Sequence, residues 1–217
     1  LPGTYSLGAY SEDEIVARNY ILKDKPDVVI NVVDATNLER NLYLTTQLIE
    51  MGANVVIALN MIDQAEALNI EIDTNKLSKR LGVPIIKTSA LKNRGIEELI
   101  ETSIHSKKNE KLININYGED IENEIKNLSS LLETYKNKLE FPVNWTALKL
   151  LENDEYIKDK VKQLNSPSIF TKLEESNKTI EKNIGFEADM SIVDKRYSFI
   201  NIHQRRHRFR EVGRDND

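Results

Sequence analysis

The sequence of 217 residues contains no cysteine. This absence excludes disulfide bonds, thiolate metal sites and cysteine nucleophiles, and it fits a reducing compartment. The chain also has no apolar run near the ~20 residues that a membrane-spanning helix needs, and no signal peptide at its start. From the sequence alone we therefore expect a soluble intracellular polypeptide.

The chain also has no excess of positively charged residues. The chain has 30 Lys and Arg residues against 35 Asp and Glu residues, which gives a formal net charge of -5. Binding to the phosphates of nucleic acid needs a basic surface, so we expect no nucleic-acid partner. The hydrophobic content of 40% is enough to bury a core.

The first half of the chain alternates strand patterns with helix patterns. Strands are expected at 27–34, 54–60 and 83–86, and residues 112–117 have the pattern of a further short strand. Helices are expected near 11–23, 41–51, 75–81 and 96–104. The first three strands recur every ~27 residues with helices between them. This spacing is typical of βαβ units and predicts an α/β fold with a parallel sheet and right-handed crossovers.

The second half carries only helix patterns, which Pro142 and Pro167 divide into several helices. The final segment is rich in arginine and poor in apolar residues, which is typical of a disordered tail. We predict a partial α/β domain over residues 1–112, an all-helical domain over 113–200 and a tail over 201–217.

The most informative motif is Asn60-x-x-Asp63, which follows the apolar run 54–59. It places an amide and a carboxylate on the loop after a buried strand, and ligands bind at this edge of open parallel sheets. A carboxylate can accept hydrogen bonds from the N1–H and 2-amino groups of guanine, which adenine does not offer. The motif therefore predicts a guanine-binding loop and, as the first hypothesis, a GTPase.

Ser89 and Ala90 follow the next expected strand and strengthen this hypothesis. Both loops lie at carboxyl ends of neighbouring strands, so the backbone N–H of Ala90 could bond the O6 atom of guanine while Asp63 binds the opposite edge. The alternative is that Asn60 and Asp63 only form a solvated turn, where both residue types are common.

Several longer stretches resemble one family, the ferrous-iron transport protein B of bacteria and archaea. The matching stretches are Leu-Pro-Gly-Thr-Tyr-Ser-Leu (1–7), Glu-Ile-Val-Ala-Arg (14–18), Val-Val-Asp-Ala-Thr-Asn-Leu-Glu-Arg-Asn-Leu-Tyr-Leu-Thr (32–45), Ala-Leu-Asn-Met-Ile-Asp (58–63), Leu-Gly-Val-Pro (81–84) and Thr-Ser-Ala-Leu-Lys (88–92). Met61 is specific, because most other GTPases have Lys there. Trp145 to Glu152 and Arg196 to Ile200 resemble the family's helical domain.

The resemblance implies a Ras-like G domain, N-terminally incomplete, followed by a small helical domain. It implies that Asn60, Met61 and Asp63 form the guanine-specificity loop, that Ser89, Ala90 and Leu91 form the second base-contacting loop, and that Gly3 contacts the γ-phosphate. Thr4 takes the place of a water-orienting Gln, so slow intrinsic hydrolysis is expected. The implied ligands are GTP or GDP with Mg²⁺, whose ligands would lie outside this chain.

The resemblance also implies partners: a membrane-embedded transporter domain of the same parent chain, and Fe²⁺ as the transported ion. The parent would act at the cytoplasmic side of the cell membrane and couple GTP binding and hydrolysis to iron uptake. The sequence lacks a Gly-x-x-x-x-Gly-Lys-Ser/Thr phosphate loop. We therefore expect a fragment that binds GTP weakly or not at all, with no catalytic residue and no metal ligand of its own.

Two other functions remain open at this point. One is a soluble Ras-like GTPase of translation or ribosome assembly with a helical appendage, and the other is a regulatory module that keeps the G fold without catalysis. His203 and His207 have a spacing that can chelate a metal on a helix, but the neighbouring arginines would repel a cation. We expect no metal site there.

Overall fold

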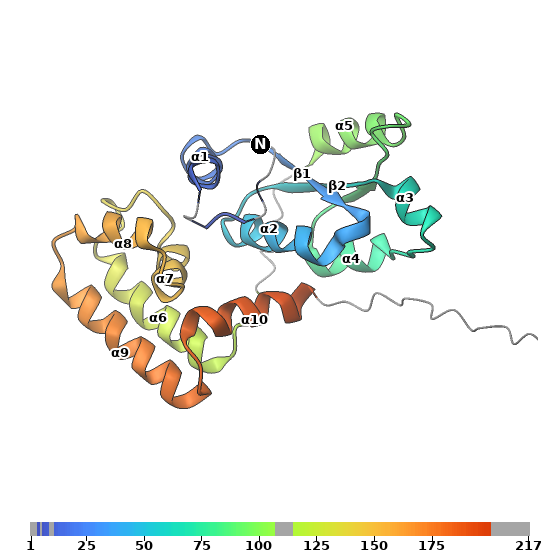
Figure 1. The fold of residues 1–217 in the computed structure, drawn as a ribbon. Coiled ribbons are helices and arrows are strands. Elements are labelled where there is room, and N and C mark those ends of the chain that lie inside the picture. The colour runs from blue at the N-terminus through green and yellow to red at the C-terminus, as the bar shows by residue number, and fades with distance from the viewer. Residues whose placement is uncertain (1–3, 5, 9–10, 107–114, 201–217) are drawn as a thin grey trace, which may run out of the picture.

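The structure is a computed structural model, and it describes residues 4, 6–8, 11–106 and 115–200. The first half builds a three-stranded parallel sheet with strand order β1-β2-β3. The strands are β1 (Val29–Asp34), β2 (Val55–Asn60) and β3 (Ile85–Lys87). The predicted parallel sheet is thus confirmed, and its carboxyl ends meet at one edge (Figure 1).

Helices cover the two faces of this sheet unequally. Helices α2 (Leu38–Glu50) and α4 (Thr74–Leu81) pack on one face, and α5 (Ile96–His105) packs on the other. The central strand β2 is buried throughout from Val55 to Leu59, as its apolar sequence predicts. Ser11 caps helix α1 (Glu12–Asn19), because its hydroxyl accepts a hydrogen bond from the Glu14 N–H, and a π-helical turn at Tyr20–Asp24 follows the helix.

The predicted strand at 112–117 is wrong for the part that the structure describes. Residues 115–117 are not in a strand, and residues 112–114 lie outside the described residues. Ile115 and Tyr117 are instead buried in the core that the two halves share, and the Tyr117 hydroxyl donates a hydrogen bond to Glu50 at the end of α2. The alternating pattern therefore marks burial without strand pairing.

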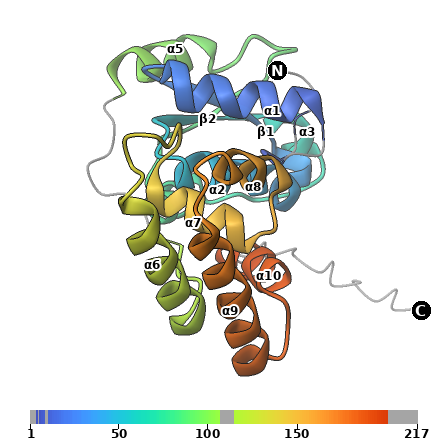
Figure 2. The same cartoon turned by 90° about the vertical axis from the view of Figure 1, so that its left-hand side faces the viewer.

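The second half is helical, as predicted. Its helices are α6 (Glu119–Glu133), α7 (Val143–Leu151), α8 (Glu155–Lys162), α9 (Pro167–Ile184) and α10 (Ala188–Ile200). Pro142 directly precedes α7 and Pro167 is the first residue of α9, where a missing N–H costs nothing. Helix α6 packs against α7 and α9 (Figure 2). No helix in the described ranges is both long and apolar enough to cross a membrane.

Buried ion pairs join the helical half to the sheet half at two places. Helix α10 packs on α2, where the buried guanidinium of Arg196 pairs with Glu50 and Glu152. On the other side, Arg18 of α1 pairs with Asp154 at 2.7 Å, just before α8. Both arginine side chains are fully buried, so the two halves share one continuous core.

Candidate functional site

The loops that follow β2 and β3 lie against each other. Asn60 is the last residue of β2, and its Oδ1 accepts hydrogen bonds from the Ala90 N–H at 3.0 Å and from the Thr88 hydroxyl at 3.4 Å. The Ile62 N–H donates to the Thr88 carbonyl at 3.2 Å. The predicted proximity of the two loops is confirmed, because neighbouring parallel strands end at the same edge of the sheet.

Met61 turns the chain sharply between Asn60 and the next helix. Its backbone is left-handed, with φ 59° and ψ 28°, a conformation that few residues other than glycine adopt. This turn starts the short helix α3 (Ile62–Ala67), whose N-cap position Met61 occupies. A non-glycine residue held in this conformation at a loop is typical of a functional site.

Asp63 does not lie on a loop, as the sequence pattern suggested, but in the first turn of α3. Ile62 and Ala65 are buried and hold this turn against the core, and a carboxylate is favourable near a helix N-terminus. The helix therefore fixes the direction of the Asp63 side chain more firmly than a loop would.

The Asp63 carboxylate is ionised at neutral pH. A hydrogen bond from the Ser89 hydroxyl lowers its pKa, and its own backbone N–H and Lys92 lower it further, against a smaller opposing effect of desolvation. The Lys92 ammonium lies 3.5 Å from Asp63 Oδ2, and the Asp63 side chain is 12% exposed. The site thus holds a negative acceptor whose position the second loop fixes.

The second loop is a compact turn closed by Ser89 and Arg94. Their N–H groups and carbonyls exchange two hydrogen bonds of 3.0 Å, and the Arg94 guanidinium reaches back to Glu66 of α3 at 3.0 Å. Gly95 ends the turn with φ +75°, and a Cβ at this position would lie 2.2 Å from the Lys87 carbonyl oxygen. Only glycine fits this close approach.

The structure brings together five of the seven residues that the sequence nominates: Asn60, Met61, Asp63, Ser89 and Ala90. Leu91 lies on the same turn, but its side chain is 87% exposed. Gly3 lies outside the described residues.

Sequence reasoning did not assign a role to Thr88 or Lys92. Thr88 is buried and bonds Asn60, and Lys92 pairs with Asp63. In the sequence, only their position directly before and after Ser89-Ala90-Leu91 indicates that they belong to the site.

The arrangement presents a negative acceptor and a backbone donor on adjacent loops. Asp63 can accept two hydrogen bonds, and the Ala90 N–H can donate one if a ligand oxygen replaces Asn60 Oδ1. For metal binding, the described part of the chain offers no group of three or more His, Cys, Asp or Glu side chains. His203 and His207 lie outside the described residues.

A parallel sheet with these two loops at its carboxyl edge, followed by a helical domain, defines a Ras-like G domain joined to an all-helical domain. Two family profiles match the chain: ferrous iron transport protein B over residues 1–103, and the FeoB cytosolic helical domain over residues 117–203. The chain belongs to the ferrous iron transport protein B family.

Curated relatives agree with this assignment. The chain is 46% identical over 203 residues to the Fe(2+) transporter FeoB of Methanocaldococcus jannaschii, covering 92% of this chain and 30% of that protein. It is 41% identical over 212 residues to an Fe(2+) transport protein A/FeoB fusion protein of Porphyromonas gingivalis, covering 92% of this chain and 25% of that protein. The chain thus spans less than a third of the length of these relatives.

Solved structures of NFeoB from S. thermophilus share the fold. The form bound to GDP.AlF4- and K+ is 38% identical, with a TM-score of 0.83 and coverage of 92% of this chain and 77% of that chain. The mGMPPNP-bound form is also 38% identical, with a TM-score of 0.79 and coverage of 92% and 74%. About a quarter of each solved chain therefore lies outside the match.

Proposed function

We propose that this chain is the guanine-binding part of the cytosolic region of a ferrous-iron transporter. In the parent protein, this region would act at the cytoplasmic side of the membrane and couple the binding and hydrolysis of GTP to the uptake of Fe²⁺ by a membrane-embedded domain. Family membership supports the assignment, as do the solved relatives that bind GDP or mGMPPNP.

The observation that carries the proposal is the pairing of Asp63 with the Ser89-Ala90 turn. The ionised Asp63 carboxylate accepts hydrogen bonds from the N1–H and the 2-amino group of guanine, and these replace its 3.5 Å contact with Lys92. The Ala90 N–H then donates to the guanine O6 in place of Asn60 Oδ1, which is 3.0 Å away. Adenine carries an amino group at position 6 and no N1–H, so it is rejected at both contacts.

The phosphate end of the nucleotide needs further groups. Mg²⁺ usually binds one or two carboxylates together with the phosphates of the nucleotide, and we propose that its protein ligands lie outside this chain. Gly3 stays a predicted γ-phosphate contact. The described residues therefore explain how the base is selected, and we assign none of them a role in hydrolysis.

A nuclear magnetic resonance titration of the 217-residue chain tests this function. We expect guanosine and GDP to shift the amide signals of Met61 and Ala90 with similar, weak affinities, on the order of millimolar. Adenosine should not shift them. Asp63→Ala should abolish the guanosine shifts, whereas Glu97→Ala, an exposed carboxylate on α5, should retain them. Equal shifts with adenosine would contradict the proposal.

A further inference from the structure

Lys92 binds the carboxylate that we assign to guanine recognition. Its Nζ atom lies 3.5 Å from Asp63 Oδ2, and its side chain is 64% exposed. The backbone of Lys92 is held within the second loop, because its N–H lies 3.2 Å from the Ser89 carbonyl oxygen and 3.3 Å from the Ser89 hydroxyl oxygen. The ammonium therefore ends a long, exposed side chain whose backbone is fixed close to Asp63.

Helix α3 offers two carboxylates to the second loop. Glu66 is bound by the Arg94 guanidinium, with 3.0 Å between Arg94 Nη1 and Glu66 Oε2. Asp63 is left as the α3 carboxylate that Lys92 binds. The loop and the helix thus meet in two ion pairs, and the Lys92 pair is the one that involves the guanine-binding carboxylate.

The Asp63 carboxylate has too few acceptor sites for its present partners and guanine together. An ionised carboxylate has two oxygens with about four lone-pair sites. The Ser89 hydroxyl, the backbone N–H of Asp63 and the Lys92 ammonium already use three of them. Guanine brings two more donors, its N1–H and its 2-amino group. One of the present partners must therefore leave when guanine binds.

Lys92 is the partner that leaves at the lowest cost. Ser89 is 1% exposed and its backbone is paired with Arg94, and the N–H of Asp63 is fixed in the first turn of α3. The Lys92 ammonium regains water when it turns away, because its side chain is exposed. Ion pairs that involve an exposed lysine contribute little free energy. Guanine therefore replaces Lys92 and keeps the other two partners.

We propose that Lys92 is a specificity-determining residue of this site, because it competes with the 2-amino group of guanine for Asp63. Hypoxanthine, the base of inosine, has the N1–H and the O6 atom of guanine but no 2-amino group. It needs one acceptor site on Asp63 and leaves Lys92 in place. Lys92 therefore weakens the binding of guanosine and not that of inosine. This inference rests on the proposed function, since it requires that Asp63 binds the base.

Salt should reveal the competition, although guanosine carries no charge. Raising the NaCl concentration from about 0.01 M to about 1 M shortens the Debye length from about 30 Å to about 3 Å, which weakens the pair of Lys92 and Asp63. The affinity of the wild type for guanosine should therefore rise about two- to fivefold, the range expected for an ion pair with an exposed lysine. Its affinity for inosine should stay unchanged.

Substitution of Lys92 tests the same competition in nuclear magnetic resonance titrations followed at the Ala90 amide. At low salt, Lys92→Met should bind guanosine about two- to fivefold more tightly than the wild type, bind inosine with unchanged affinity, and lose the salt dependence. Lys92→Arg keeps a cation and should keep the salt dependence. The matched control is Lys87→Met, which removes an exposed lysine at the end of β3 that forms no ion pair within the described residues. It should behave like the wild type.

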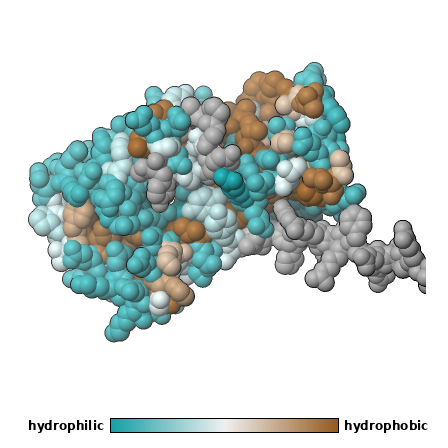
Figure 3. Space-filling view, viewed as in Figure 1, coloured by the Kyte–Doolittle hydropathy of each residue, from teal (hydrophilic) through white to brown (hydrophobic). Residues whose placement is uncertain are grey.

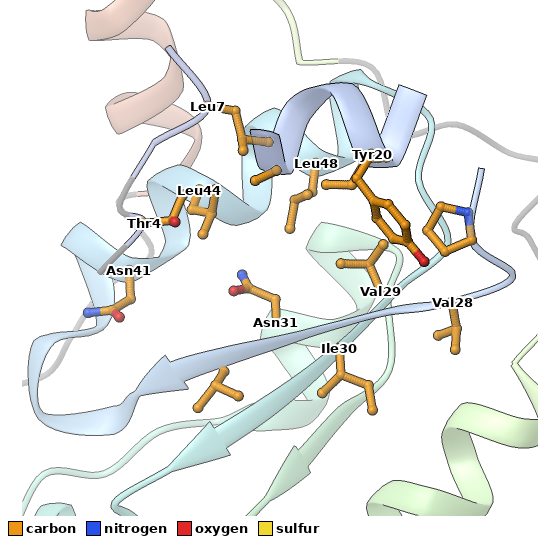
Figure 4. A pocket seen from close by; sticks show the side chains of 14 residues that line it. Thr4, Leu7, Tyr20, Val28, Val29, Ile30, Asn31, Asn41, Leu44 and Leu48 are labelled. Atoms are coloured by element: carbon orange, nitrogen blue, oxygen red, sulfur yellow. The ribbon is translucent and has the colours of Figure 1, made fainter. Parts of the chain in front are cut away.

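Two apolar parts of the molecule could take up a purine independently of Lys92. One is the surface over α5, where Ile100 and Ile104 are exposed and Figure 3 shows apolar residues gathered. The other is a cavity of about 610 Å³ between β1, α1 and α2. Figure 4 shows Asn31 pointing into it, and the described residues that line it carry no charge. Binding at either place should not differ between the wild type and Lys92→Met.

The titrations separate failure of this inference from failure of the proposed function. An unchanged guanosine affinity in Lys92→Met, or equal gains for guanosine and inosine, would overturn the inference alone, provided that the wild type still prefers guanosine to adenosine. A wild type that does not distinguish guanosine from adenosine would overturn the proposed function and the inference with it. Shifts at Asn31 in place of Met61 and Ala90 would move the base to the cavity and contradict both.

Discussion

Arg196 and Glu50 lie 146 positions apart in the sequence and form a two-armed ion pair between α10 and the end of α2. Arg196 Nε lies 2.7 Å from Glu50 Oε1, and Nη2 lies 2.8 Å from Oε2. The same guanidinium bonds Glu152, which Lys149 contacts at 2.8 Å. This buried network of two cations and two anions joins the helical domain to the sheet.

Removing Arg196 should destabilise the whole chain. Arg196→Met leaves two buried carboxylates with Lys149 as their remaining cation, which should lower the free energy of unfolding by about 3–5 kcal/mol. Arg196→Lys should recover part of this loss, because an ammonium cannot make the two-armed contact. Urea unfolding followed by circular dichroism measures both. The control is Lys136→Met, which breaks an exposed pair with Glu133 and should change little; equal effects of the two substitutions would rule out a stabilising network.

Glu152 should make the free energy of unfolding depend on pH in the acid range. Burial would raise its pKa, but the charges of Lys149 and Arg196 outweigh burial and lower it to about 2. Because this folded-state pKa lies below the unfolded value of about 4.3, the stabilisation is present above that value and is lost as the pH falls toward 2. Urea unfolding between pH 5 and 2 should show this loss. Glu152→Gln should flatten the pH dependence, and the exposed Glu133→Gln should leave it unchanged.

Asp154 has two roles that substitution can separate. Its Oδ1 caps α8 by accepting the Ile157 N–H at 3.0 Å, and its Oδ2 binds Arg18 at 2.7 Å. Asp154→Ser keeps a cap but leaves the buried guanidinium unpaired, so it should cost about 3–5 kcal/mol. Arg18→Met should cost less, because Asp154 keeps its bond to Ile157.

The double variant provides the check on this interpretation. Once Arg18 is replaced by Met, Asp154→Ser no longer leaves a buried charge without a partner. The two single substitutions should therefore lower the free energy of unfolding by more, in sum, than the double substitution does. Thermal and urea unfolding of the four proteins measures the coupling. Simple additivity would show that the α1–α8 ion pair does not contribute.

Gly95 should be intolerant of a side chain. Gly95→Ala puts a Cβ 2.2 Å from the Lys87 carbonyl oxygen at a positive φ, and should lower the free energy of unfolding by roughly 2–4 kcal/mol and weaken guanosine binding. The matched control is Gly52→Ala, which has a similar φ of +72° but no atom within 4 Å of the added Cβ. It should cost only about 1 kcal/mol. Equal losses would mean that the close approach at Gly95 is unimportant.

The sequence predicts the sheet and the meeting of the two loops well, for a simple reason. Short, mostly apolar runs at regular spacing define parallel strands, and their carboxyl ends must share an edge, which places Asn60 beside Ala90. Helix α3 was not predicted, because six residues are too few to show a helical period. The pattern alone therefore leaves Asp63 on a loop.

The contacts between the two halves could not be predicted in this way. Arg18 and Arg196 are long charged side chains that a sequence pattern assigns to the surface, yet both are buried beside distant carboxylates. Only the folded structure shows which carboxylate pairs with which arginine. The left-handed turn at Met61 is equally hidden, because methionine shows no preference for that conformation.

The most direct test of guanine selection is the exchange of Asp63 for Asn. An amide retains an oxygen for the N1–H of the base but presents an NH₂ group where guanine has its 2-amino group; xanthine has a carbonyl oxygen there. Titrations of the wild-type chain and the Asp63→Asn variant with guanosine and xanthosine, followed at the Ala90 amide, measure the preference. We predict that the wild type prefers guanosine and the variant prefers xanthosine. An unchanged preference for guanosine in the variant would contradict the assignment of Asp63 as the guanine-binding carboxylate.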